Sequence, residues 1–537
     1  MKDFINRNFA RTGTLMKFIL RRERIVSLIW IVSMVLFSVA LAPMFEQIGD
    51  DPAIVNLLSE PFIVILVGPV FNTSIGGIFA AEMLLMTVIT VGVMNVFFVL
   101  RHTRSDEEVG RNEVIRSFPL GRLSSQTAAL SMAFILNLII GLLTFLGLAI
   151  LPMDGFTVFG ALVYGLALTA GGIFFAALTA VFAQLFQNSR TASAYTFGAI
   201  GIMYLIRAIG DAAFASGHGI WRIALLSPLG LITHSRPFAH NWIWTLFILL
   251  GIAVILIVVA LKFNSMRDID QGLIPSKKGK DRAGLLYKNT FGLGFKLTIG
   301  LSIGFIVAVI ALAVTYGSVM GSIDDMLAVI NNMLGDGQDP ITAESFVSII
   351  ILLCAVTASI PSMAIMLKLV GEEKAGRIEG ILAKPVSRTK LFLGYFILSL
   401  VVGIVTVFIA FMTLWITSLI FMDDPLSFSA MARMIVTYIP VMIFMTGLAA
   451  LFAGIIPGKT VIAWAYLGFC FFIGYIGGII QLPDAAGYLS PFGYVPNFPM
   501  TNPAASIIGL IAVGIFGVIM AAIGMLAYKK RDIKFHA

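Results

Sequence analysis

Residues 126–151, QTAALSMAFILNLIIGLLTFLGLAIL, contain no charged side chain. An α-helix needs about 20 predominantly apolar residues to cross the hydrocarbon core of a bilayer, so this stretch predicts a transmembrane helix. The rest of the chain has the same character, because 59% of the 537 residues are hydrophobic and 12% are charged, whereas about a quarter of the residues of soluble domains are charged. The composition excludes a soluble globular protein, a disordered chain and a disulfide-rich scaffold. It indicates an all-α integral membrane protein.

Twelve apolar stretches of sufficient length divide evenly between the two halves of the chain. In the first half they are residues 25–44, 76–100, 126–151, 156–186, 191–211 and 241–263. In the second half they are residues 294–317, 344–368, 391–417, 431–456, 460–481 and 503–528. The fourth and ninth stretches have the length of a tilted or broken helix. Residues 61–74 are apolar but short and interrupted by proline and glycine, which predicts an outer loop or a re-entrant segment.

The basic residues are concentrated in every second loop. Together with the two termini, these loops hold 30 of the 36 lysine and arginine residues. The loops lie near residues 101–125, 187–190, 264–293, 368–390 and 457–459. By the positive-inside rule, the pattern predicts a multi-pass protein of the cell membrane with both termini in the cytoplasm. The loops connect the helices at one end, which we call the basic end. The opposite end of the helices is called the far end. Such loops explain the net charge of +8, so no nucleic-acid partner is predicted.

The first apolar stretch is predicted to be a retained helix and not a secretory signal. The small residues 40–42 resemble a cleavage site, but 24 residues precede the stretch and Pro43 directly follows the site. Basic residues stand before the stretch and predict an elbow along the lipid headgroups. They are Lys17, Arg21, Arg22 and Arg24.

An internal repeat relates the two halves at an offset of 266 residues. The second stretch of each half is followed by a similar sequence, GRNEVIRSFPLGR at 110–122 and GRIEGILAKPVSR at 376–388, with identity at six of thirteen positions. A Leu-Ser-Pro-x-Gly sequence also precedes the last stretch of each half, at 226–230 and 489–493. The same positions in both halves indicate a duplicated unit.

The repeat predicts the domain organisation. The first transmembrane unit is residues 1–263, a cytoplasmic linker is residues 264–293, and the second unit is residues 294–537. Because each unit has an even number of spans, the two six-helix units are predicted to be parallel repeats related by a pseudo-twofold axis along the membrane normal.

The repeated loop has the spacing of a short amphipathic helix. Glu107 and Arg111 stand four residues apart, as do Glu373 and Arg377, which is the spacing of an ion pair on a helix. A proline then ends each helix. The helix is either a solvated extension that stabilises the second span or a docking element for a partner protein. The same charges in both copies favour docking.

This pattern of an acidic pair, Gly-Arg-x-Glu, a short helix and Pro-x-x-Arg, present in both halves of a twelve-helix chain, resembles the permease subunits of ABC-2 type exporters. It resembles most the duplicated permeases grouped as exporters of polyketide antibiotics. In such permeases the loop is a coupling helix that inserts into the ATP-binding subunit. The resemblance implies ATPase-coupling roles for Glu107, Gly110, Arg111, Glu113, Pro119, Arg122, Glu373, Gly376, Arg377, Glu379, Pro385 and Arg388.

The resemblance also implies the partners. Two copies of an ABC ATP-binding subunit are expected, with ATP and magnesium bound there and no cofactor in this chain. The expected substrates are hydrophobic small molecules, antibiotics among them, moved out of the cell through the bilayer. Leu382 and Lys384 stand where the first copy has Arg116 and Phe118, so the two docking surfaces need not be equivalent.

The chain is not expected to hydrolyse ATP itself. Gly458-Lys459-Thr460 invites comparison with a phosphate-binding loop, but the required glycine is replaced by Ala453 and apolar helices flank the site. The cytoplasmic segments are about 30 residues or shorter, whereas an ATPase domain needs on the order of a hundred or more. We therefore expect a transport permease and not an enzyme.

An ion-gradient-driven secondary transporter is the alternative, and it requires ionisable groups within the spans. The candidates are Glu82 and Glu344 near the far end, and Arg207 with Asp211, an i, i+4 pair that is either functional or structural. The second unit has no charges at the positions that correspond to this pair, which argues against a symmetric ion site.

A membrane enzyme or a scaffold is the remaining class. The five histidines are scattered in loops and at a terminus, so no catalytic set or metal site is predicted. Cys354 and Cys470 lie in apolar segments and are predicted to be buried thiols.

Overall fold

The structure is a computed structural model, and it describes residues 8–47, 58–59, 61–111, 117–217, 219–268, 271–275, 290–320, 327, 343–422, 425–476, 483–498 and 504–532. Within these residues the regular elements are all helices, and eleven of them are long and apolar enough to cross a membrane. A shorter apolar helix spans Val461–Tyr475. The predicted class, an all-α protein with many membrane spans, is confirmed. The chain divides into two compact units, Met1–Gly279 and Lys280–Ala537.

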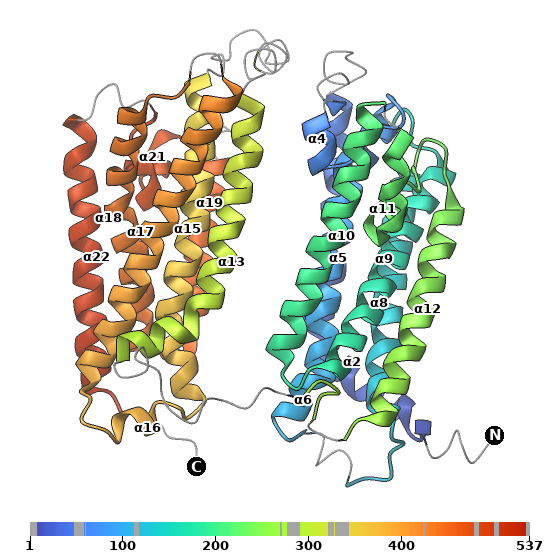
Figure 1. Cartoon of the computed structure of the whole chain (residues 1–537), viewed down its shortest axis with the longest axis horizontal. Helices are drawn as coiled ribbons and strands as arrows, with labels where there is room; N and C mark the ends of the chain where they lie inside the picture. Colours follow the sequence, from blue (N-terminus) through green and yellow to red (C-terminus); the bar gives the residue numbers. More distant parts are fainter. Residues whose placement is uncertain are drawn as a thin grey trace. The chain divides into compact units, whose positions relative to one another are not determined.

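Unit 1, drawn from blue to green in Figure 1, has six long helices in its described residues. They are α2 (Thr12–Leu41), α5 (Ile75–His102), α8 (Ser124–Ile150), α9 (Val158–Leu185), α10 (Ser189–Ala215) and α12 (Ile243–Met266). The shorter elements are η1 (Ala42–Gln47), α4 (Pro61–Leu66), α6 (Arg104–Glu108), η2 (Gly219–Leu226) and α11 (Pro228–Thr233).

Unit 2, drawn from lime to red, repeats this order of long helices (Figure 1). The long helices are α13 (Thr290–Val319), α15 (Ala343–Lys374), α17 (Arg388–Phe421), α18 (Phe428–Ile455) and α22 (Ala504–Lys530), with α19 (Val461–Phe471) in fifth place. The shorter elements are α16 (Glu379–Leu382), η5 (Pro457–Lys459), the π-helical η6 (Phe472–Ile476), α21 (Asp484–Gly487) and η7 (Pro491–Tyr494).

Several elements differ in detail from the sequence-based expectations. The helices α9 and α17 run unbroken for 28 and 34 residues. The expected elbow is not a separate element, because α2 is continuous from Thr12 and carries the basic residues in its first turns. The predicted helix 460–481 appears as α19 and η6, and residues 477–482 lie outside the described part of the chain.

The fourth long helix is the centre of the packing in each unit. In unit 1, α9 packs against α5, α8 and α12, and in unit 2, α18 packs against α15, α17 and α22. The first and third helices also pair in both units, α2 with α8 and α13 with α17. Both Leu-Ser-Pro sequences begin short helices, α11 and η7. The same neighbours therefore recur in the two halves.

Small residues allow the closest of these contacts. Gly447 and Gly454 on α18 face Gly517 and Gly524 on α22, and a Cβ added at Gly454 would overlap the carbonyl oxygen of Gly524. Transmembrane helices approach this closely only where side chains are absent. Cys354 and Cys470 are buried in unit 2 and are free thiols, as predicted.

Candidate functional site

The acidic pair that follows α5 in unit 1 has two separate sets of partners. The Asp106 carboxylate accepts hydrogen bonds from Arg111, at 2.9 Å, and from Arg22 of α2, at 2.8 Å. Glu107 forms ion pairs with Arg104, within α6, and with Arg267, the residue that follows α12. The first carboxylate thus ties the loop to the first helix of the unit, and the second ties it to the last.

The Glu107 pair belongs to a buried network. Arg104 also donates to the carbonyl oxygens of Phe186 and Gln271, both at 2.8 Å. Arg267 donates to the same Gln271 carbonyl, at 3.1 Å, and to the side chain of Gln184. Two buried guanidinium groups share one carboxylate here, and backbone carbonyls and the Gln184 side chain accept further hydrogen bonds from them, which lowers the cost of burying the two positive charges.

Unit 2 repeats the arrangement with fewer contacts. Glu372 accepts two hydrogen bonds from Arg377, at 2.6 and 3.0 Å, and Glu373 pairs with Arg531, the residue that follows α22. At the position of Arg104 this unit has Val370. In the part of unit 2 that the structure describes, the clamp between the loop and the last helix consists of the Glu373 pair and one further bond.

That further bond is present in both units. Arg122 donates to the carbonyl oxygen of Arg267 at 3.2 Å, and Arg388 donates to that of Arg531 at 2.8 Å. Arg122 therefore binds the backbone of Arg267, whose side chain pairs with Glu107. In the same way, Arg388 binds the backbone of Arg531, whose side chain pairs with Glu373. Arg267 and Arg531 are not among the residues predicted from the sequence. Their common position, one residue after the last span of each unit, is the signal that identifies them.

The glycine of each loop ends the helix that was predicted to continue through it. Gly110 has a φ of 72° and Gly376 a φ of 69°, a left-handed conformation that glycine adopts without strain. The continuous helix expected across Glu373 and Arg377 is therefore wrong, and so are the i, i+4 pairs. Each arginine instead turns back to the acid five residues before it, as the Asp106 and Glu372 contacts show.

The remaining predicted coupling residues lie at the surface or outside the described part. Glu113 is among residues 112–116, which the structure does not describe. Glu379 begins the single-turn helix α16 and is exposed, as are Pro119 and Pro385.

The buried ionisable residues of the far end meet in unit 1. Arg207 and Asp211 pair on α10 at 3.1 Å, and both are fully buried. The second oxygen of Asp211 lies 2.8 Å from Nε2 of His234, just after α11, while Arg207 donates to the carbonyl oxygen of Ile65 in α4. The i, i+4 spacing predicted the pair of Arg207 and Asp211 but not the contact with His234. The short helices α4 and α11 are thus bound to α10 through one carboxylate and one guanidinium.

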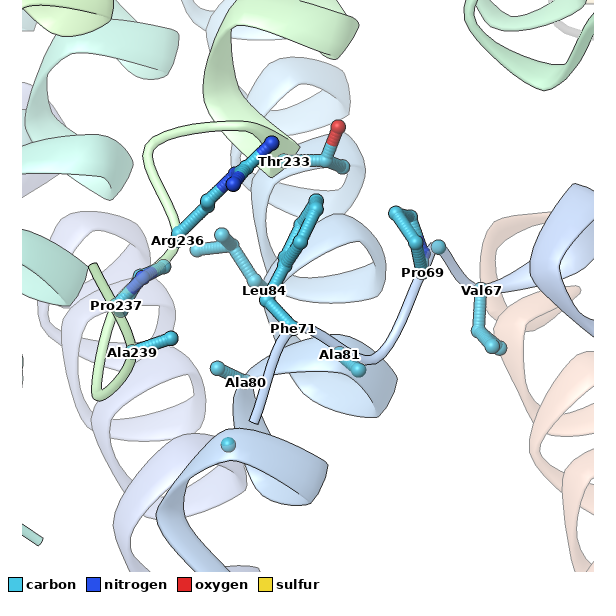
Figure 2. A pocket seen from close by; sticks show the side chains of 12 residues that line it. Val67, Pro69, Phe71, Ala80, Ala81, Leu84, Thr233, Arg236, Pro237 and Ala239 are labelled. Atoms are coloured by element: carbon cyan, nitrogen blue, oxygen red, sulfur yellow. The ribbon is translucent and has the colours of Figure 1, made fainter. Parts of the chain in front are cut away.

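A small cavity of about 10 Å³ lies beside this network (Figure 2). It is lined by α5, by residues 67–71, by Thr233 at the end of α11 and by the segment that follows α11, from which Arg236 approaches it. The Arg236 guanidinium lies over the rings of Trp242, at 3.7 Å, and Phe71, at 4.2 Å. Burial lowers the pKa of Arg236 from its ordinary value. Cation–π contacts compensate this charge in place of an acid, because the described residues provide no ion-pair partner.

The other two candidates are Glu82 in unit 1 and Glu344 in unit 2. Glu82 is half-buried on α5 and has no ion-pair partner among the described residues. Glu344 falls in the first turn of α15, and its side chain lies outside the described part of the structure. The structure therefore unites Arg207 and Asp211 with His234, and in its described part Glu82 makes no ion pair with them.

Two comparisons with known proteins agree with each other. Residues 288–529, which lie within unit 2, match the family described as "Multidrug efflux system permease Rv1217c, C-terminal domain". The chain is also 29% identical to the multidrug efflux system permease protein Rv1217c of Mycobacterium tuberculosis, over 98% of this chain and 97% of that protein. The chain is therefore similar to a multidrug efflux permease from end to end.

Proposed function

We propose that this chain is the membrane-spanning permease of an ATP-driven exporter of hydrophobic compounds, antibiotics among them. Separate ABC ATP-binding subunits, two per chain, bind ATP and magnesium and hydrolyse the nucleotide. The full-length similarity to a multidrug efflux permease supports export of varied compounds. The coupling role is supported by a clamp that is present in both units. In this clamp, Glu107 and Glu373 each bind the arginine that follows the last helix of their unit.

The clamp gives each loop the connections that a coupling element needs. The loop continues from the second long helix and leads into the third, while the ion pair and the arginine–carbonyl bond fix it to the end of the sixth. A partner that pushes on the loop therefore moves three helix ends together. A loop without these bonds would deform locally and would transmit less of the displacement.

The exposed residues of the loops define the surface offered to a partner. In unit 1, Val109 and Phe118 are 66% and 60% exposed, which is unusual for apolar residues beyond the membrane helices and favours a protein partner. In unit 2 the exposed residues are charged and include Glu379 and Lys384. We expect two ATPase subunits to bind with unequal contributions from apolar and charged contacts.

The stoichiometry tests the proposal. The chain is co-purified with an ABC ATPase encoded beside it, and the mass of the complex and the substrate-stimulated hydrolysis are measured. Two ATPase chains per permease are expected, and Phe118→Glu and Glu379→Lys are expected to reduce the stimulation to different extents. One ATPase chain per permease, or full stimulation after both substitutions together, would remove the coupling role from these loops.

The energy source separates the proposal from a secondary transporter, which the buried Asp211 and His234 would suit. Uptake of a fluorescent hydrophobic compound into inverted vesicles is expected to require ATP and to persist when the proton gradient is collapsed. Uptake driven by an imposed proton gradient after ATP depletion would reverse the assignment.

We propose that the protein lies in the cell membrane, with both termini and the basic end in the cytoplasm. Both natural cysteines are buried, so a cysteine at the exposed position 384 reports on one site. A membrane-impermeant maleimide is expected to label Lys384→Cys in inverted vesicles and not in intact cells. Labelling in intact cells would reverse the topology.

A further inference from the structure

A pocket of about 420 Å³ opens at the basic end of unit 1, between α2, α5 and α6. Three arginines line it, Arg22 from α2, Arg101 from the end of α5, and Arg111 from the loop. Phe18 and Val109, both exposed, form its apolar rim. The pocket thus combines basic groups with apolar surface.

The positive charge in the pocket is only partly compensated. Asp106 binds Arg22 and Arg111, and the buried Glu23 accepts a hydrogen bond from Arg101 at 3.2 Å. Two carboxylates thus face three guanidinium groups. The side chains of Arg101 and Arg111 remain 51% and 54% exposed. Because a guanidinium has five N–H donors, both arginines retain donors for an anion.

The two helices place these arginines at the boundary of the hydrocarbon region. No charged residue follows Arg24 until the end of α2, and none lies between Glu82 and Arg101 on α5. A guanidinium beside a long uncharged helical segment sits at the level of the lipid headgroups. The pocket is therefore at headgroup depth whichever leaflet it faces.

An apolar stripe leads from the pocket along α2. Phe18, Ile25, Ile29, Val32 and Leu36 are all exposed and recur at the spacing of one helical face. The stripe extends for about 27 Å at 1.5 Å per residue. It is the surface that a lipid acyl chain would cover. A water-soluble partner would not reach it.

We propose that this pocket binds the headgroup of an anionic phospholipid. The phosphodiester accepts hydrogen bonds from Arg101 and Arg111, Arg22 supplies further positive charge, and the acyl chains lie along the stripe on α2. At the position of Arg101, unit 2 has Leu367, so that unit lacks one of the two guanidinium groups that would bind the phosphodiester. The proposal does not depend on the ATP-driven mechanism, since it requires only that α2 and α5 cross the bilayer.

The pairing in unit 2 supplies a matched control. Arg377 is the counterpart of Arg111 and pairs with Glu372 as Arg111 pairs with Asp106. Loss of Arg377 removes the same charge from the same loop geometry without touching the pocket. Arg101→Lys and Arg111→Lys keep the charge at the pocket and control for misfolding.

The experiment measures lipid binding by the purified full chain in detergent, by native mass spectrometry. Phosphatidylglycerol and phosphatidylcholine are titrated against the wild type, Arg101→Gln, Arg111→Gln, the two lysine variants and Arg377→Gln. Binding selective for phosphatidylglycerol is expected, and each pocket glutamine variant is expected to weaken it about fivefold, the contribution of one basic residue near an anionic surface. The lysine variants and Arg377→Gln are expected to retain the selectivity.

Four results would overturn the proposal. The first is equal binding of the two lipids by the wild type. The second is an equal loss of phosphatidylglycerol binding in Arg377→Gln, which would assign the effect to the net charge of the protein and not to the pocket. The third is displacement of phosphatidylglycerol by soluble glycerol phosphate at equal concentration, which would identify a site for free phosphate esters. If the pocket variants weaken binding of the ATPase subunit and leave lipid binding unchanged, the pocket serves the protein partner instead.

Discussion

Replacing Arg267 with glutamine is expected to release the repeated loop of unit 1 from the end of α12. The Arg267 side chain is 5% exposed and holds Glu107, which is itself buried, together with Gln184 and the Gln271 carbonyl. Removing one partner of a buried ion pair costs about 3–5 kcal/mol. Arg104 still neutralises Glu107 in the variant, so we expect a cost of about 3 kcal/mol, the lower end of that range.

The same substitution in unit 2 is expected to have a smaller effect. The Arg531 side chain is 18% exposed, and among the described residues it is the arginine that pairs with Glu373. A hydrogen bond to a charged group contributes about 1.5–3 kcal/mol, and partial exposure places Arg531→Gln at the lower end. Since about 1.4 kcal/mol is a factor of ten in an equilibrium, the two substitutions should increase local opening by roughly a hundredfold and roughly tenfold.

Amide hydrogen exchange of the purified protein, followed by mass spectrometry, measures this opening. The relevant peptides contain residues 104–111 and 371–378, and exchange in each is compared between Arg267→Gln, Arg531→Gln and the wild type. Arg190→Gln serves as the control, because Arg190 is exposed. Unchanged exchange in residues 104–111 of the Arg267 variant, or a larger effect in unit 2 than in unit 1, would contradict the assignment of the clamp.

Further substitutions test the other contacts, each by thermal unfolding of the purified variant. Gly376→Ala is expected to destabilise by about 1 kcal/mol because of its left-handed backbone, whereas Gly371→Ala within α15 is expected to stabilise by about 0.5–1 kcal/mol; equal effects would refute the conformational reason. Asp211→Asn leaves a buried guanidinium without its counter-charge, and a loss of about 3–5 kcal/mol is expected; an unchanged midpoint would show that the pair is dispensable. Gly454→Ala is expected to force α18 away from α22, whereas Gly468→Ala meets open space and is expected to be neutral or better; equal midpoints would mean that the helices are not in close contact.

The long helices could be predicted because their signal is one-dimensional. A stretch of apolar residues long enough to cross a bilayer has few other stable conformations in lipid, so 126–151 is observed as α8 at Ser124–Ile150. The observed helix ends differ from the predicted ends by a few residues, because local capping determines where a helix begins. Ser387, for example, accepts a hydrogen bond from the Lys390 amide and starts α17 at Arg388.

The partners of the charged residues could not be predicted in the same way. Glu107 and Arg267 are separated by 160 positions in the chain, and the sequence offered Arg111 four residues away as a plausible local partner. The glycine at 110 reverses the chain and prevents that pair. His234 was missed for the same reason, since its contact with Asp211 depends on where α11 places it and not on spacing.

The two copies of the clamp also explain why duplicated sequence need not give duplicated behaviour. Both units keep the glutamate, the turn glycine and the loop arginine, so both loops have the same connection to the last helix of their unit. Only unit 1 adds Arg104, which shares the glutamate and binds two carbonyl oxygens; at this place unit 2 has Val370. Because the added contacts are buried, they restrain the first loop more than the second. An equal displacement by two identical partners should therefore meet unequal resistance, and the same charge change in the two loops should alter coupling to different extents.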